Sequence, residues 1–272
     1  MGVTVLYPYQ IPEGKTGAQA IDHLSKRLLA LGAVHTGQFL VDCETYISAP
    51  QHGPSKAVHV LHDSEYPVTT FSILDTGTGK QIPLVADNLF DLLMLKMTSV
   101  YTSKKQTKIE SKGARFEYGD FLIKLGSVTM MENFKGILIE IEYRPCVVLF
   151  YCWEMIREVL QSFLGVTVPK EYPSYFTPQP VVNAMGQQQI HPKHNDIYEP
   201  IDTINQYLEH FTNYRKQNVM PQSQVTNQQA NMPLNTGMRM KKLNADEPLY
   251  RAINCLMLVK CVRMLPDQIA VK

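Results

Sequence analysis

Residues 107–145 have the sequence TKIESKGARFEYGDFLIKLGSVTMMENFKGILIEIEYRP, which is the strongest strand pattern in this chain. Apolar and polar residues alternate in three segments, and the alternation is most regular in residues 137–144. Gly119-Asp120 separates the first two segments, and residues 133–136 separate the last two. Alternation with a period of two is typical of a strand with one face toward the core, and short turns favour antiparallel pairing. These residues therefore predict an antiparallel sheet with one solvated face.

Further strand-like and helical segments lie on both sides of this stretch. A capping box at Thr16 and Gln19 begins a helix that ends before Gly32, Asn88 can cap a second helix, and a third is expected from Val148 to Leu164. About seven or eight strands tend to curl or close into a barrel, which removes exposed edges. Residues 1–165 are therefore expected to form an α+β core, an antiparallel β-barrel of about eight strands flanked by helices. The additional strand-like runs are residues 39–44, 58–61, 69–74 and 81–86.

The remainder of the chain changes character twice. Residues 166–200 are rich in proline and predict a loop over the surface, whereas residues 201–217 have the spacing of a helix that packs back on the core. From residue 218 to 272 Gln, Asn, Met and Pro dominate without a period, which predicts a disordered or atypical tail. Within it, residues 249–265 are apolar again and could dock as a short helix.

Composition limits the classes of function. The 272 residues include 26 Lys and Arg against 25 Asp and Glu, a net charge of +1, which argues against a dedicated nucleic-acid binder. Two short basic clusters, residues 104–108 and 239–242, are expected to be solvated surface. No run of about 20 apolar residues predicts a membrane span. Five cysteines without a C-x-x-C pair are typical of free thiols in a reducing compartment, so we expect a cytosolic or nuclear protein.

Motifs of the common enzyme classes are missing from the sequence. It contains no G-x-S-x-G, H-E-x-x-H or glycine-rich dinucleotide motif. His59 and His62 are three residues apart on an expected strand, so they point to opposite faces and cannot bind one metal ion together.

One group of charged residues could support catalysis. Glu140 and Glu142 are two apart on a strand, so their carboxylates share a face, about 7 Å apart along the chain. Triphosphate-tunnel enzymes line a barrel in this way, with paired glutamates for a divalent metal and basic residues for phosphates. The alternative, which we favour, is a solvated outer face with cross-strand ion pairs worth about 0.2–1 kcal/mol each. Arg144 shares this face, and neighbouring strands could add Arg115, Glu117 and Lys124.

Many segments in order resemble one known family, Mediator of RNA polymerase II transcription subunit 20, also called the TRF-proximal protein family. The similarity covers about residues 1–217, and no single motif is diagnostic. The segments are MGVT at 1–4, GQFLVDCETY at 37–46, HDSEYP at 62–67, KIE at 108–110, FEYGDF at 116–121, GSVTM at 126–130, EIEY at 140–143, LQSFLG at 160–165 and RKQ at 215–217.

The resemblance implies a nuclear, non-enzymatic subunit of the Mediator head module. In that family an antiparallel β-barrel flanked by helices pairs with a similarly folded partner, Mediator subunit 18. The pair is implied to contact other head subunits and to act, indirectly, on RNA polymerase II and TATA-binding-protein-type factors. On this hypothesis no residue has a catalytic, cofactor-binding or metal-binding role. Only the alternative, a metal-dependent phosphohydrolase of the triphosphate-tunnel type, would use Glu140 and Glu142.

Overall fold

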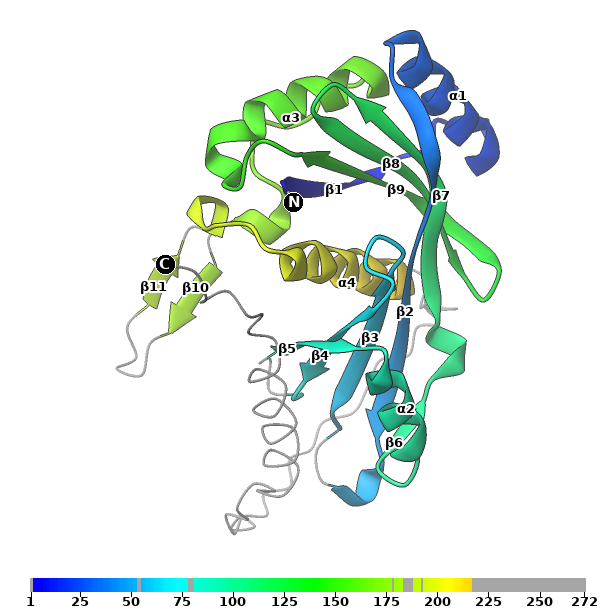
Figure 1. The fold of residues 1–272 in the computed structure, drawn as a ribbon, viewed down its shortest axis with the longest axis vertical. Coiled ribbons are helices and arrows are strands. Elements are labelled where there is room, and N and C mark those ends of the chain that lie inside the picture. Colours follow the sequence, from blue (N-terminus) through cyan, green and yellow to red (C-terminus); the bar gives the residue numbers. More distant parts are fainter. Residues whose placement is uncertain are drawn as a thin grey trace, which may run out of the picture. The chain divides into compact units, whose positions relative to one another are not determined.

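Nine strands build one antiparallel sheet in the computed structural model (Figure 1). The structure describes residues 2–52, 55–77, 81–177, 179–182, 188–191 and 193–216. The chain divides into two units, Met1–Pro221 and Gln222–Lys272, and every described residue belongs to the first. The predictions for the tail, residues 218–272, lie outside the described residues. The strands of the main sheet are β1 (Val3–Tyr9), β2 (Val34–Ser48), β3 (Ala57–Asp63), β4 (Thr69–Asp75), β5 (Gln81–Asp87), β6 (Tyr101–Ser103), β7 (Ile109–Tyr118), β8 (Phe121–Met130) and β9 (Asn133–Tyr143).

The sheet is strongly curved but not closed. Its strands are ordered β1-β9-β8-β7-β2-β3-β4-β5, with β6 paired to β2, and no pairing among the described residues joins β1 to β5. The expected α+β architecture and antiparallel pairing are confirmed, and the barrel has an open seam between its first and last strands. Helix α4 (Pro200–Lys216) lies inside the curve of the sheet (Figure 1).

A side chain of α4 substitutes for the missing strand at one side of the seam. The Gln206 side-chain oxygen accepts from the backbone N–H of Leu6 at 3.1 Å, and its amide nitrogen donates to the carbonyl of Thr4 at 3.0 Å. Both backbone groups belong to β1, so Gln206 satisfies part of an edge that would otherwise be unpaired.

The sheet separates two main groups of buried apolar side chains. On the outer face, α1 (Gly17–Ala30) and α3 (Leu149–Leu164) cover the strands, and on the inner face α4 does so. A third, smaller group lies under α2 (Leu89–Lys96). Residues typical of the outer group are Val5, Leu24, Ile139, Trp153 and Ile156, and residues typical of the inner group are Leu6, Phe39, Leu61, Leu138 and Phe211.

The helix signals of the sequence were correct except at Asn88, and the first helix ends before Gly32 as expected. Thr16 and Gln19 form the predicted capping box, and Gly165 ends α3 with a φ of +71°. The prediction for Asn88 was wrong: its side chain makes no capping hydrogen bond, and Asp87 instead accepts from the N–H of Leu89 at 3.1 Å. Within residues 166–200 the structure adds a short hairpin, β10 (Gln179–Val182) and β11 (Gln188–His191).

Candidate functional site

Glu140 lies at the centre of the inner face, under α4. Lys124 stands directly opposite on β8, and its Nζ donates to Oε1 of Glu140 at 2.9 Å. The Tyr207 hydroxyl of α4 donates to Oε2 of Glu140 at 2.5 Å. The Lys124 and Glu140 side chains are only 3% and 5% exposed. Both oxygens of this carboxylate are therefore engaged by the protein itself.

A second, more exposed set of charges surrounds this buried pair. Oε1 of Glu65 lies 3.3 Å from Nε of Arg115 and 3.8 Å from Nζ of Lys124. Oε1 of Glu117 forms an ion pair with Nη2 of Arg144 at 2.8 Å. The structure thus brings Arg115, Glu117, Lys124, Glu140 and Arg144 to one face, as the alternation predicted. Glu142 is bound differently, because its Oε1 accepts from the backbone N–H of Gly2 at 2.7 Å.

The electrostatics of this cluster depend on burial. Burial works against the charged form of Lys124, but the neighbouring Glu140 and Asp63 carboxylates outweigh it and raise the pKa of Lys124 to about 12. Burial raises the pKa of Asp63 to about 6, although Lys124 acts in the opposite direction. Burial, together with Glu140, raises the pKa of the Tyr207 hydroxyl well above its usual range. Lys124 therefore stays cationic and Tyr207 stays a hydrogen-bond donor.

The expectation of a solvated outer face was wrong for Glu140 and Lys124. Their face of the sheet points into the curve, where Tyr207 and the rest of α4 cover it. The tunnel interpretation requires carboxylates free to bind a metal ion. Within the described part of the chain, no three His, Cys, Asp or Glu side chains are arranged to hold one. Only one sequence signal pointed to Tyr207: it is a tyrosine on the apolar face of a predicted helix, and its hydroxyl needs a partner when buried.

The two histidines of β3 point to opposite faces, as predicted. His59 lies 3.0 Å from the Thr45 hydroxyl, and burial lowers its pKa to about 4. His62 lies between Asp42 of β2 and Asp91 of α2, at 2.9 and 3.1 Å. His62 therefore links α2 to the sheet.

Within the basic cluster at residues 104–108, Lys104 and Lys105 are exposed as expected and Lys108 has acidic partners, and two of the three described cysteines are buried. Lys108 pairs with Asp42 at 3.1 Å and with Glu44 at 3.2 Å, whereas the cluster at residues 239–242 lies outside the described residues. Cys43, Cys146 and Cys152 are free thiols, and burial raises the pKa of Cys43.

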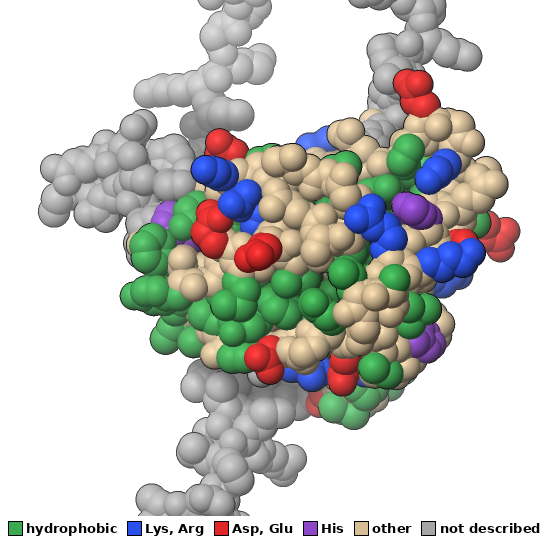
Figure 2. Space-filling view, turned by 90° about the horizontal axis from the view of Figure 1, so that it is seen from above, with side chains coloured by type: hydrophobic (Ala, Val, Ile, Leu, Met, Phe, Trp, Pro, Cys, Tyr) green, Lys and Arg blue, Asp and Glu red, His purple; other side chains and the backbone are tan. Residues whose placement is uncertain are grey.

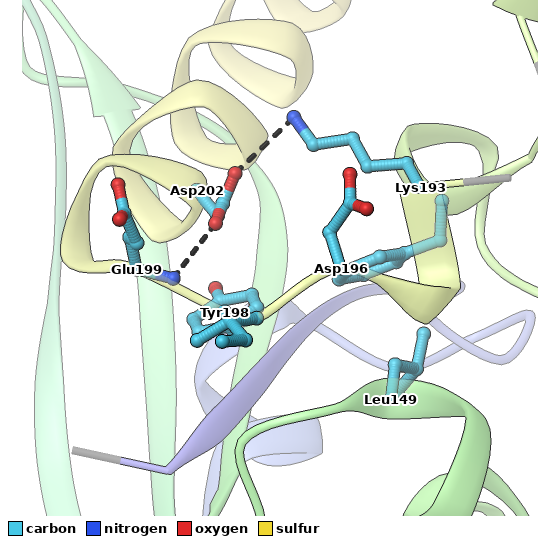
Figure 3. A pocket seen from close by; sticks show the side chains of 8 residues that line it. Leu149, Lys193, Asp196, Tyr198, Glu199 and Asp202 are labelled. Carbon is cyan, nitrogen blue, oxygen red and sulfur yellow. Dashed lines mark hydrogen bonds and ion pairs between the residues drawn. The ribbon is translucent and has the colours of Figure 1, made fainter. Parts of the chain in front are cut away.

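A small cavity of about 200 Å³ lies where the segment before α4 meets α3 (Figure 3). Asp202 projects toward it, accepts from the backbone N–H of Glu199 at 2.8 Å and pairs with Lys193 at 3.2 Å. These bonds begin α4 and hold the preceding segment in place, so we assign the cavity a structural role.

Large apolar side chains are exposed in groups on α3 and on α2, and α1 adds Leu29. On α3 and beside it they form a continuous stripe at helical spacing, and hydrophobic side chains gather broadly on the face that carries α1 and α3 (Figure 2). A second stripe follows α2. Exposed patches of this kind, rich in aromatic residues and Met, are typical of protein–protein interfaces. The α3 stripe consists of Val147, Phe150, Tyr151 and Met155, with Ile197 beside it, and the α2 stripe of Leu89, Leu92 and Leu95.

A family model described as "TATA-binding related factor (TRF) of subunit 20 of Mediator complex" matches residues 1–212. The chain belongs to the Mediator subunit 20 family. The family resemblance noted in the sequence is thereby confirmed.

Relatives named Mediator of RNA polymerase II transcription subunit 20 match most of this chain. The Drosophila melanogaster protein is 74% identical over 219 residues, which cover 79% of this chain and 87% of the relative. The Anopheles gambiae protein is 66% identical over 81% of this chain and 98% of its own length. The human protein is 40% identical, again over 81% of this chain and 98% of the relative. Members of the Mediator subunit 20 family therefore share the unit that carries the sheet.

Some solved structures of other proteins match this chain at low identity and with a low TM-score. A putative adenylate cyclase from Bacillus halodurans matches with a TM-score of 0.38 at 10% identity, over 63% of this chain and 94% of that chain. A likeness of this size bears on neither the fold nor the function of this chain. None of the described helices is both long and apolar enough to cross a membrane.

Proposed function

We propose that this chain is a non-enzymatic subunit of the Mediator head module in the nucleus, where it pairs with Mediator subunit 18. The pair relays regulatory input to RNA polymerase II and, through other head subunits, to TATA-binding-protein-type factors. The chain itself binds no specific DNA sequence and no membrane. The observation that carries this proposal is the membership of residues 1–212 in the Mediator subunit 20 family.

The surface of the molecule supports a role in protein contacts. Tyr151 is 77% exposed and Phe150 is 53% exposed on one stripe of α3, and Leu95 is 63% exposed on α2. Exposed aromatic and aliphatic side chains grouped in this way contribute most to the free energy of binding when a partner buries them. The α3 and α2 stripes are therefore the two candidate docking faces for subunit 18 and its neighbours.

Co-expression with Mediator subunit 18 tests the proposal. We expect a stoichiometric heterodimer in size-exclusion chromatography with light scattering. Tyr151→Asp tests the α3 stripe and Leu95→Asp tests the α2 stripe, and the face that binds subunit 18 is the one whose variant releases it. Asp22→Asn, a change on the exposed side of α1, is the control. A chain that stays monomeric beside subunit 18 contradicts the proposal.

The second candidate is the metal-dependent phosphohydrolase. It is favoured by one observation, the gathering of Arg115, Lys124, Glu140 and Arg144 on the inner face. We expect the chain to release no phosphate from tripolyphosphate with Mg²⁺ or Mn²⁺ above a heat-killed control. Metal-dependent release that disappears when Glu140 and Glu142 are both changed to Gln would replace the first proposal with this one.

A further inference from the structure

An acidic notch lies between the N-terminal end of α2 and the loop that joins β3 to β4. Its volume is about 280 Å³. We define the notch by six of the residues that line it: Asp42, His62, Tyr66, Pro67, Thr70 and Asp91. It lies on the opposite side of the sheet from Glu140, because His62 and Asp42 point away from the inner face.

The charges around the notch do not balance. His62 Nδ1 lies 2.9 Å from Asp42, and its Nε2 lies 3.1 Å from each oxygen of Asp91. The hydrogen bond to Asp42 and the charge of Asp91 raise the pKa of His62, and its protonated form donates to both carboxylates, so one positive charge faces two negative ones. Lys108 is shared between Asp42 and Glu44. Asp63 also lines the notch, but its carboxyl is buried and interacts with Lys124 of the inner face, so it is not counted among the charges of the notch. Among the described residues, Asp91 has His62 as its one partner, so it is the carboxylate with most capacity left.

A second observation, independent of the charges, points to a missing hydrogen-bonding group. Thr70 is fully buried, and its hydroxyl has no hydrogen-bond partner among the described residues. Thr70 lies directly opposite His62 in the β3–β4 pairing, so both side chains stand on the face that lines the notch. Buried hydroxyl groups are nearly always paired, and an unpaired one costs about 1–3 kcal/mol.

The walls of the notch fit a flat group on an apolar stem. Tyr66, Pro67 and Leu40 are among the residues that line it, and Leu40 is 42% exposed. An arginine side chain matches this combination, because its guanidinium binds carboxylates with two parallel N–H bonds and packs against aromatic rings. A bare metal ion matches it poorly, since the described carboxylates and histidines form no metal-binding cluster.

We propose that the notch binds the guanidinium of an arginine presented by a partner polypeptide, with Asp91 as the anionic anchor and the Thr70 hydroxyl as a further acceptor. The partner is identified by this chemistry alone. The proposal is independent of whether subunit 18 supplies the arginine.

Short peptides test the proposal on the full chain in solution. Acetyl-Gly-Arg-Gly-amide is titrated while the backbone amide signals of His62, Thr70 and Asp91 are followed by NMR. We expect saturable shifts confined to the notch. The same peptide with citrulline, which has the shape of arginine without its charge, is expected to cause none.

Asp91→Asn is expected to weaken binding of the arginine peptide by about tenfold, the size of one charge-assisted hydrogen bond. Asp22→Asn on α1 is the matched control and should bind as the wild type does.

A second variant covers the case in which Asp91→Asn loosens α2. Thr70→Val keeps the shape of the side chain and removes its hydroxyl, so it should weaken peptide binding while leaving the melting temperature unchanged or higher. A purely structural threonine would not combine these two effects. The proposal is overturned if the arginine peptide gives no saturable shift, if citrulline or lysine peptides bind as well, or if both variants bind like the wild type. Equivalent shifts caused by MgCl₂ alone would also overturn it, in favour of a metal site.

Discussion

At the scale of single residues, the buried pair of Lys124 and Glu140 dominates the inner face. Taking two charges out of water is costly, so such pairs add little net stability, but removing one partner leaves the other uncompensated. Tyr207 supplies the additional hydrogen bond that Glu140 needs. This arrangement fixes how α4 sits in the curve of the sheet.

Glu140→Gln is expected to lower the free energy of unfolding by about 3 kcal/mol, because the buried Lys124 ammonium loses its hydrogen-bonded counter-ion and keeps only the weaker attraction of Glu65 and Asp63. Urea denaturation monitored by circular dichroism measures the effect. Glu142→Gln is the matched control two residues away, where the side chain is half-buried and bonded to one backbone N–H. The free energy of unfolding of Glu142→Gln is expected to fall by less than about 1.5 kcal/mol. Equal losses in both variants would contradict the assignment of Glu140 as the buried member.

The sequence predicted which residues share this face but not how deeply they lie. Alternation along residues 137–144 places Glu140 and Arg144 on one side, since side chains in a strand alternate strictly. The pattern does not tell which side of a curved sheet faces inward or what covers it. Tyr207 is 67 positions away from Glu140, and the position of α4 is set by long-range packing that a local pattern does not contain.

His62 gives the fold a pH dependence with a defined sign. The hydrogen bond to Asp42 is the largest cause that raises its pKa above 6.5. The folded state therefore binds this proton more tightly than the unfolded state. The resulting stability is fully present below pH 6.5 and is lost as the pH rises through the raised pKa. His62 is 40% exposed, so the contribution is at most about 1 kcal/mol.

Urea denaturation of the wild type and His62→Gln between pH 5.5 and 8.5 measures this contribution. The difference between the two proteins should be largest at the acidic end and should shrink toward alkaline pH. Taking the difference removes the background from His59 and Asp63, whose pKa values also differ from the ordinary ones. A difference that grows with pH would mean that His62 acts as a neutral group.

At the scale of elements, the open seam of the sheet depends on α4. The Gln206 side chain satisfies the N–H of Leu6 and the carbonyl of Thr4 on the free edge of β1. The helical spacing of residues 201–217 predicted the helix, and it also predicted that an apolar face would pack on the core. It did not predict that a buried polar residue would complete a strand edge, because that depends on the open topology of the sheet.

Gln206→Leu keeps a comparable volume but leaves two backbone groups of β1 buried without partners. We expect a loss of about 2–4 kcal/mol in the free energy of unfolding. Hydrogen exchange at the Leu6 amide, slow in the wild type, should become faster by a larger factor than at other core amides. Asn213→Ala, an exposed position on the same helix, should change neither quantity. Unchanged exchange at Leu6 in the Gln206 variant would contradict this role of Gln206.

At the scale of the whole molecule, the described core lies almost entirely within the region that the family model matches. The buried apolar residues of the described chain run from Val3 to Tyr214, and the family model ends at residue 212. A match over 226 residues covers 98% of the human relative, so nearly all of that protein corresponds to the first unit of this one. The tail beyond this unit has no counterpart of similar length there.

A chain that ends at Pro221 is therefore expected to fold and to pair with Mediator subunit 18 like the full chain. Its melting temperature should stay within about 2 °C of that of the full chain. In a domain of this size, a change of about 1 kcal/mol in the free energy of unfolding corresponds to about 2–4 °C. A chain that ends at Gly165 is the opposing control: it lacks α4, exposes the edge of β1 and leaves Glu140 without Tyr207, so it should fail to unfold cooperatively. A drop of several degrees in the melting temperature of the chain that ends at Pro221 would show that residues 249–265 dock on the core, since they are the only extended apolar run among the residues removed.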